Sequence, residues 1–386
     1  MPSPLIAATA VTRHYLALIL AVLLAAGTLA VLAAAPARAA VDTTIDGITY
    51  SVDPSNPGAG ATVTDYDVAG GPVVTIPDTI DIGGIDYTVT AIGEDGFFDN
   101  QLTSVTLPAG LITIGTFAFT GNLLTSVAFP EGLTTISREA FNHNQLTSVN
   151  FPDTLTTLEN QSFLGNQLTS VTLPDGITEI GTQAFAYNKL SSVTLPDSLT
   201  TIRGFAFESN ELTFVTLPAT LTTIGLGAFV DNDELTRVRF TGPAPTKIPR
   251  GDQEYLSFGT ADGLTVEFPA RYTAASEQEG FTTPEWLGYA TVPAYTLSFD
   301  TGGGSDVAPV TIWPGETLEM PSTPVRRGYT FTGWYTSPQA VTFFDPALPL
   351  TADLTVHAGW ERNSSSAGNS SVPGSLGIGS LPGFGS

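Results

Sequence analysis

The chain has 386 residues, of which 42% are hydrophobic and 10% aromatic, so it can bury a large core divided over two or three domains. It carries 13 basic and 37 acidic residues, a formal net charge of -24. Nucleic acids and anionic membrane surfaces are bound by clustered lysine and arginine, so this charge argues against both as partners. The absence of cysteine excludes disulfide bonds and thiolate metal sites.

Residues 1–40 predict export. The apolar run "YLALILAVLLAAGTLAVLAAA" follows Arg13 and His14, and Ala37-Arg38-Ala39 fits the pattern that signal peptidases cleave. About 20 apolar residues could also span a bilayer as an uncleaved anchor, but the helix-weakening Gly27-Thr28 pair favours removal. The 11 basic and 37 acidic residues that remain give a charge of -26, which favours solubility outside the cell. We therefore expect a bacterial protein that is secreted or held at the cell surface.

Ahead of the repeats described next, residues 41–96 contain two strand patterns, "ITYSV" and "IDYTVTAIG". We expect this segment to form an N-terminal cap together with the first repeat. A cap is needed because the terminal coil of a repeat protein otherwise exposes apolar surface and an open strand edge.

The segment 97–240 repeats itself every 22 residues, which predicts a solenoid. Three residue types keep this register through the repeats. They are the prolines Pro108, Pro130, Pro152, Pro174, Pro196 and Pro218, the phenylalanines Phe97, Phe119, Phe141, Phe163, Phe185, Phe207 and Phe229, and the asparagines Asn100, Asn122, Asn144, Asn166, Asn188, Asn210 and Asn232.

One copy, "LTSVTLPDGITEIGTQAFAYN" (residues 168–188), shows how a coil is built. Its first part alternates apolar and polar residues like a strand with one buried face, a Pro-Asp-Gly turn follows, and "ITEI" gives a second extended piece. Coils stacked at about 4.8 Å form one continuous core. We expect the phenylalanines to stack inside it and the asparagines to satisfy buried backbone groups, with a ligand role for either column as the alternative.

These copies resemble the BspA-like leucine-rich repeats of bacterial surface proteins, over residues 72–240. Ser137, Glu159 and Arg203 replace the glycine of the pattern without touching the core columns. The resemblance implies a mainly β fold, a leucine-rich-repeat solenoid of 22-residue coils with N- and C-terminal caps, followed here by a small β-grasp-like domain. It also implies a role in adhesion or attachment.

Outward-facing strand positions carry the candidate binding residues. Most are threonine, which favours strands, or serine, and together they also form a regular hydroxyl surface on which a protein or glycan could bind. Phe214, Arg237 and Arg239 replace threonine or serine at equivalent positions of the last repeats, which we call breaks in the columns of the repeat. Aromatic and arginine residues are typical interface anchors. Packing of these three residues against the C-terminal cap is the equal alternative. The candidate set is Phe214, Arg237, Arg239, Thr169, Ser170, Thr172, Thr194 and Thr216.

The rest of the chain divides into three segments. Residues 241–293 are expected to form the C-terminal cap. Residues 294–361, with "YTLSFDTGGGS", "RRGYTFTGWYT" and "ADLTVHAGW", resemble the Listeria-Bacteroides repeat, a β-grasp-like module whose core positions are matched here by aromatic residues. Residues 362–386 are rich in glycine and serine and predict a flexible tail. Its "LPGFG" differs from the sortase signal at Phe384, so no wall anchor is evident. In the segment 294–361, the aromatic residues that match the core positions of the Listeria-Bacteroides repeat are Phe299, Tyr329, Phe331, Trp334 and Trp360.

No pattern of catalytic residues is present. His143 lies at a coil corner and His357 in a different segment, and no H-E-x-x-H, G-x-S-x-G or phosphate-loop motif occurs. The acids of the repeats follow the proline as a column of turn residues, with calcium bridging as the alternative. That column is Glu131, Asp153, Asp175 and Asp197. We expect no enzyme activity, no cofactor and no metal.

The sequence therefore predicts an exported, non-catalytic binding or adhesion protein that uses the solenoid surface to bind an extracellular protein or glycan. A structural spacer or passive cell-envelope component without a specific ligand is the alternative. Ice or crystal-surface binding by the threonine columns is a further hypothesis, weakened by the serine, asparagine and alanine among them. The identity of the partner and the oligomeric state do not follow from the sequence.

Overall fold

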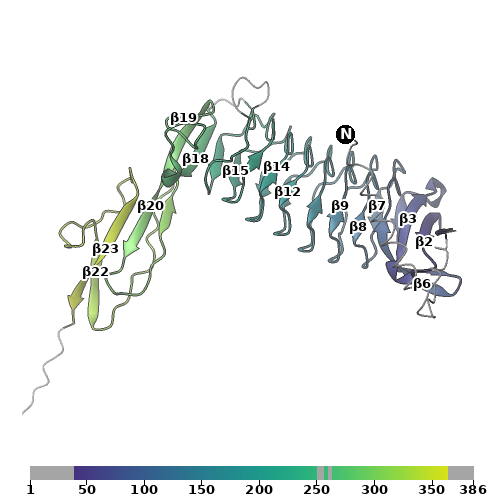
Figure 1. Cartoon of the computed structure of the whole chain (residues 1–386), viewed down its shortest axis with the longest axis horizontal. Helices are drawn as coiled ribbons and strands as arrows, with labels where there is room; N and C mark the ends of the chain where they lie inside the picture. Colours follow the sequence, from purple (N-terminus) through teal and green to yellow (C-terminus); the bar gives the residue numbers. More distant parts are fainter. Residues whose placement is uncertain (1–38, 250–255, 260–262, 364–386) are drawn as a thin grey trace, which may run out of the picture.

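The computed structural model describes residues 39–249, 256–259 and 263–363. Nearly all of the expected signal peptide and flexible tail lie outside these residues. The described chain is mainly β, with three short 3-10 helices and no α-helix. Figure 1 shows an elongated molecule in which a stack of coils is flanked by strands at both ends. The predicted fold class, a capped leucine-rich-repeat solenoid followed by a small β domain, is confirmed.

The N-terminal end is a small sheet that merges with the first coil. β1 (Val41–Ile45), β2 (Ile48–Val52) and β3 (Ala61–Tyr66) form an antiparallel meander, with a 3-10 turn at Pro57–Ala59. β3 then pairs in parallel with β6 (Ile85–Ile92), while β5 (Thr79–Ile82) pairs antiparallel with β6. A second 3-10 turn, Val68–Gly70, precedes β4 (Val73–Thr75). The two strand predictions in this segment are confirmed by β2 and β6.

One ladder of parallel strands comes from the "TI" pieces of successive coils. Each strand is two residues long and pairs with its equivalent 22 positions away, for example Thr113 with Thr135 and Thr135 with Thr157. The side chain of the second residue points into the core and is buried. The members are β8 (Thr113–Ile114), β9 (Thr135–Ile136), β10 (Thr157–Leu158), β12 (Glu179–Ile180), β14 (Thr201–Ile202) and β16 (Thr223–Ile224), and the regular pairing is interrupted between β10 and β12.

The other ladder comes from the "LTSVTL" pieces, and we call its outward side the strand face. Its members are β4, β7 (Ser104–Thr106), β11 (Ser170–Thr172), β13 (Ser192–Thr194), β15 (Phe214–Leu217) and β17 (Arg237–Phe240). They pair as β4 with β7, β11 with β13, and β15 with β17. The strand pattern was also expected in the copies at 125–129 and 147–151, which form no regular strand. In both copies phenylalanine replaces leucine, at Phe129 and Phe151. Their rings stack 5.8 Å apart, wider than the strand spacing of about 4.8 Å.

The phenylalanine column is the spine of the core. Successive rings from Phe97 to Phe229 are fully buried and stack with centroids 5.1–5.7 Å apart and planes within 12° of parallel. Phe258 continues the stack into the C-terminal cap, 5.6 Å from Phe229. Stacked aromatic pairs add to the free energy gained from apolar burial. The predicted aromatic spine is confirmed.

The asparagine column lies at a corner of each coil and bonds to the backbone, as predicted. Asn188 Nδ2 donates to the carbonyl oxygens of Phe163, at 2.9 Å, and Phe185, at 3.1 Å. Its Oδ1 accepts from the amide nitrogen of Leu168 at 3.0 Å. Equivalent bonds form at Asn122, Asn144, Asn166, Asn210 and Asn232.

The C-terminal strands extend the strand-face ladder. β18 (Thr265–Pro269) pairs in parallel with β17, and β20 (Tyr289–Asp300) pairs in parallel with β18. A 3-10 turn at Ala270–Tyr272 and β19 (Glu285–Trp286) lie between them, and β19 pairs antiparallel with β20.

The last sheet is built on the second half of β20. This strand pairs antiparallel with β21 (Val310–Ile312) and in parallel with β23 (Leu354–Arg362), which pairs antiparallel with β22 (Tyr329–Tyr335). A separate core forms here around Leu297, Trp334 and Val356, with Phe299 and Phe331 packed against it. The other two aromatic residues expected in this core lie at its edge. Trp360 contacts Phe331 with centroids 5.6 Å apart, and Tyr329 lies under the guanidinium of Arg326 at 4.0 Å.

Candidate functional site

The hydroxyl residues of the predicted set lie on the strand face. Thr169, Ser170, Thr172, Thr194 and Thr216 are all exposed. Thr172 of β11 is the direct neighbour of Thr194 of β13 in the parallel register. The hydroxyls of Thr172, Thr194 and Thr216 bond to no residue in the part of the chain that the structure describes. The face therefore presents free donors and acceptors at the strand spacing.

Phe214, Arg237 and Arg239 come together at the C-terminal end of this face. The register pairs Phe214 with Arg237 and Thr216 with Arg239. The guanidinium carbon of Arg237 lies 4.8 Å from the centre of the Phe214 ring, and that of Arg239 lies 5.3 Å away. Cation–π contacts of this geometry hold the ring and both arginines in one cluster.

A buried carboxylate lies beside this cluster, on the next strand, in register with Arg239. Glu267 of β18 has a side chain only 2% exposed, and its Oε2 accepts from Arg239 Nε at 2.8 Å. Arg237 Nη1 lies 3.7 Å from Glu267 Oε1. Burial of an unpaired carboxylate is costly, and the two arginines supply the partners that offset this cost.

Arg239 also reaches the C-terminal sheet. Its Nη2 lies 2.8 Å from Glu316 Oε1, and its guanidinium carbon lies 4.3 Å from the centre of the Trp313 ring. The Arg239 side chain is consequently 13% exposed, whereas that of Arg237 is 47% exposed. Arg239 thus packs against the cap and the last sheet. Anchoring of a partner by the cluster stays a prediction, with Arg237 as its most accessible member.

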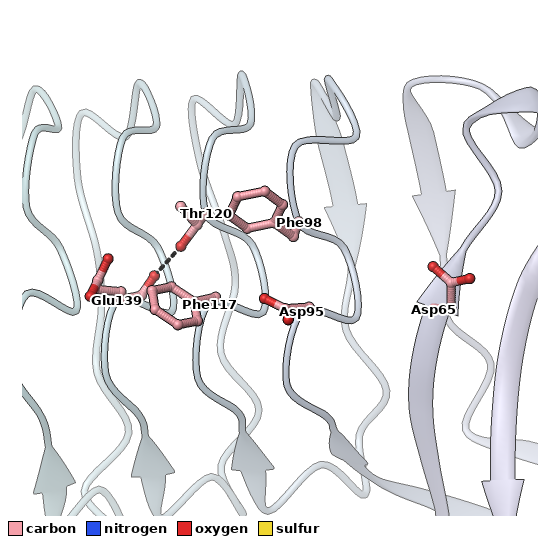
Figure 2. A pocket seen from close by; sticks show the side chains of 6 residues that line it. All are labelled: Asp65, Asp95, Phe98, Phe117, Thr120 and Glu139. Atoms are coloured by element: carbon pink, nitrogen blue, oxygen red, sulfur yellow. Dashed lines mark hydrogen bonds between the residues drawn. The ribbon is translucent and has the colours of Figure 1, made fainter.

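A pocket at the opposite end of the solenoid was not predicted. It has a volume of about 730 Å³ and is lined by residues from β3 and three successive coils, shown in Figure 2. Phe98 and Phe117 differ from the residues at equivalent positions in most other coils. They therefore depart from the repeat pattern in the same way as Phe214, and this departure is visible in the sequence. The lining residues are Asp65, Asp95, Phe98, Phe117, Thr120 and Glu139.

The two histidines do not share a site. His143 is exposed at a coil corner, as expected, and His357 Nδ1 lies 2.9 Å from Asp300 Oδ2. The pKa of Asp300 is lowered, first by the backbone amide of Gly302 and then by the bond to His357. Within residues 39–249, 256–259 and 263–363, no group of three or more His, Cys, Asp or Glu side chains could hold a metal ion. The same ranges contain no helix long and apolar enough to cross a membrane.

The fold and these surfaces define a class: a capped parallel β-solenoid that is joined to a small β domain. Family models identify its two parts. The model of the BspA type leucine rich repeat region matches in six copies, over residues 84–190 and 156–250. The model of the Listeria-Bacteroides repeat domain matches residues 295–359. The chain thus contains BspA-type leucine-rich repeats within residues 84–250 and a Listeria-Bacteroides repeat domain at residues 295–359.

Similar proteins come from several bacteria. Internalin H of Listeria monocytogenes is 36% identical over 91 residues, which are 22% of this chain and 16% of that protein. The chain spans 8–16% of the length of the curated relatives that it matches. A leucine rich cell surface protein of Faecalibacterium prausnitzii is 24% identical with a TM-score of 0.47, covering 59% of this chain and 70% of that one. A leucine-rich repeat protein of Bacteroides ovatus is 18% identical with a TM-score of 0.36, covering 59% and 71%.

Proposed function

We propose that this is an exported, non-catalytic binding protein that attaches to an extracellular protein or glycan through its strand face. The observation that carries the proposal is the row of free, exposed hydroxyls at Thr172, Thr194 and Thr216, which continues into the Phe214–Arg237–Arg239 cluster. A flat surface with repeated donors and an aromatic–arginine end suits the recognition of an extended partner.

The small β domain would act as a spacer or a second contact in this proposal. The signal-peptide pattern in residues 1–40 supports secretion or display at the cell surface. The division into a cap at 41–96, repeats at 97–240, a second cap at 241–293 and a β domain at 294–361 stays part of the proposal.

Binding of the purified protein to arrays of glycans and of extracellular-matrix proteins tests this function. The double variant Thr172→Glu with Thr194→Glu places two like charges on the strand face, and we expect it to weaken binding at least tenfold. The matched control is Thr178→Glu with Thr200→Glu, which makes the same change at exposed positions beside the other ladder.

Circular dichroism would check that both variants fold. Equal binding by the two variants would contradict a role for the strand face. Failure of the unmodified protein to bind any array would favour the spacer alternative.

A further inference from the structure

We propose that the pocket at the N-terminal end of the solenoid binds a lysine or arginine side chain from an extended segment of a partner protein. The pocket lies among β3 and the first coils, away from the residues of the strand face assigned above, so this inference goes beyond the proposed function. Four features support this proposal. They are the aromatic rings and the carboxylates that line the pocket, an arginine of the chain itself that contacts two of the lining residues, and the excess of acidic residues in this part of the chain.

The aromatic rings are not needed for the core. Phe98 is 47% exposed, although the neighbouring Phe97 is fully buried in the spine. The Phe98 and Phe117 rings meet edge to face, with centroids 6.5 Å apart and planes at 87°. Exposure of large apolar side chains costs free energy in the absence of a partner. The open faces of such rings attract cations because of their negative quadrupole.

Carboxylates from separate elements line the pocket together with these rings. Figure 2 shows Asp95 on the coil that carries Phe98, Glu139 beyond Phe117, and Asp65 on the cap. Asn142 Nδ2 donates to Glu139 Oε2 at 3.1 Å, and the Thr120 hydroxyl donates to the backbone oxygen of Glu139, so both fix its position. Within the part of the chain that the structure describes, Asp65 and Asp95 form no ion pair.

The chain already places one cation in this environment. The guanidinium carbon of Arg138 lies 4.6 Å from the centre of the Phe117 ring, and Arg138 Nη1 lies 3.5 Å from Glu139 Oε1. A guanidinium is therefore held between an aromatic face and a carboxylate on one side of the pocket. Phe98 and Asp95 offer the same combination on the other side, without a cation of their own.

The local charge distinguishes a cationic occupant from a neutral one. Residues 41–137 contain twelve acidic residues and no lysine or arginine. Such a one-sided distribution creates a negative potential that attracts and steers positively charged partners. A neutral glycan would gain nothing from this potential, whereas a segment bearing lysine or arginine would gain both long-range attraction and contacts within the pocket.

Fluorescence anisotropy with the purified protein and a labelled Gly-Arg-Gly-Arg-Gly peptide tests the proposal. We expect saturable binding that weakens with added salt and is lost when citrulline, which has the shape of arginine without its charge, replaces arginine. Phe98→Leu and Asp95→Asn should each weaken binding about three- to tenfold. Asparagine suits Asp95 because that residue has a φ of 58°, a conformation that asparagine tolerates.

Asp175→Asn is the matched control, because it makes the same charge change in an exposed turn of a distant coil, and it should bind like the unmodified protein. The proposal is overturned if neither the arginine peptide nor its lysine equivalent binds saturably, or if Phe98→Leu and Asp95→Asn bind as the control does. Equal affinity for spermidine, or competition by a neutral maltooligosaccharide, would overturn the assignment to a protein side chain. None of these measurements involves Thr172 or Thr194, so the proposal for this pocket and the proposal for the strand face can be contradicted independently.

Discussion

Asn188 illustrates how one side chain joins two neighbouring coils. Its amide group bonds to four backbone groups, which belong to Phe163, Phe185, Ala186 and Leu168. Buried backbone groups at a coil corner cannot reach water, so each needs such a partner. The fixed spacing of 22 residues reveals this role in the sequence, because it places every asparagine above the preceding one.

The substitution Asn188→Ala should be strongly destabilising. It leaves the buried amide of Leu168 without its partner, at about 1–3 kcal/mol, while the carbonyl oxygens of Phe163 and Phe185 keep their bonds to Asn166 and Asn210. We therefore expect the free energy of unfolding to fall by about 1–3 kcal/mol. Asn150→Ala is the control, because Asn150 is exposed on the strand face and its loss should cost less than about 0.5 kcal/mol. Urea unfolding of both variants measures the difference. Equal costs would show that the asparagine column does not stabilise the stack.

Contacts with residues outside the 22-residue repeat cannot be predicted from the sequence pattern. The sequence reveals that Phe214, Arg237 and Arg239 break the columns, yet Arg239 binds Glu267, 28 residues away, and Glu316 in the last sheet. Neither acid belongs to the 22-residue pattern. For the same reason, no single column pointed to the pocket, which combines Asp65 of the cap with residues of three coils.

At the scale of the elements, the stability of each coil depends on its neighbours. The strands of the shorter ladder have two residues each, too few to be stable alone, and their buried side chains complete a core only when stacked. Repetition of the pattern therefore predicts the ladders well. It does not predict the loss of regular strands beside Phe129 and Phe151, because this depends on the width of the stacked rings.

Phe185→Ala should divide the solenoid into two cooperative units. The ring is fully buried between Phe163 and Phe207, at centroid distances of 5.7 and 5.6 Å. Its removal should cost about 3–5 kcal/mol, and in a repeat protein this cost falls on the neighbouring coils. Hydrogen exchange should accelerate in residues 163–210, while residues 41–92 keep their protection. Phe98→Ala makes the same change at an exposed ring and serves as control; equally fast exchange along the whole chain in Phe185→Ala would contradict local coupling.

At the scale of the whole molecule, β20 joins the solenoid to the last sheet without an intervening loop. Its first half pairs with β18 of the cap, and its second half pairs with β21 and β23. Figure 1 shows the last sheet extending from the end of the stack along this strand. The sequence indicates a change of pattern near residue 294, but the shared strand becomes visible only in the structure, because both halves have similar strand composition.

A single strand can bend and twist, so the contacts of Arg239 with Glu316 and Trp313 should restrict the angle between the two parts. We expect Trp313→Ala combined with Glu316→Gln to broaden the range of shapes measured by small-angle X-ray scattering and to accelerate hydrogen exchange in β21. The melting temperature of the solenoid should change little, because Glu267 keeps both of its arginines.

Two further variants separate orientation from stability. Glu319→Gln changes an exposed acid close to Glu316 in sequence and should leave the scattering unchanged. Arg239→Met should behave differently from both, because it leaves the buried carboxylate of Glu267 with only Arg237, at 3.7 Å, and loss of a buried partner costs about 3–5 kcal/mol. If the variant at Trp313 and Glu316 scatters as Glu319→Gln does, β20 alone sets the angle. The contacts of Arg239 would then serve the cap, where they keep one buried charge paired, and not the arrangement of the two parts.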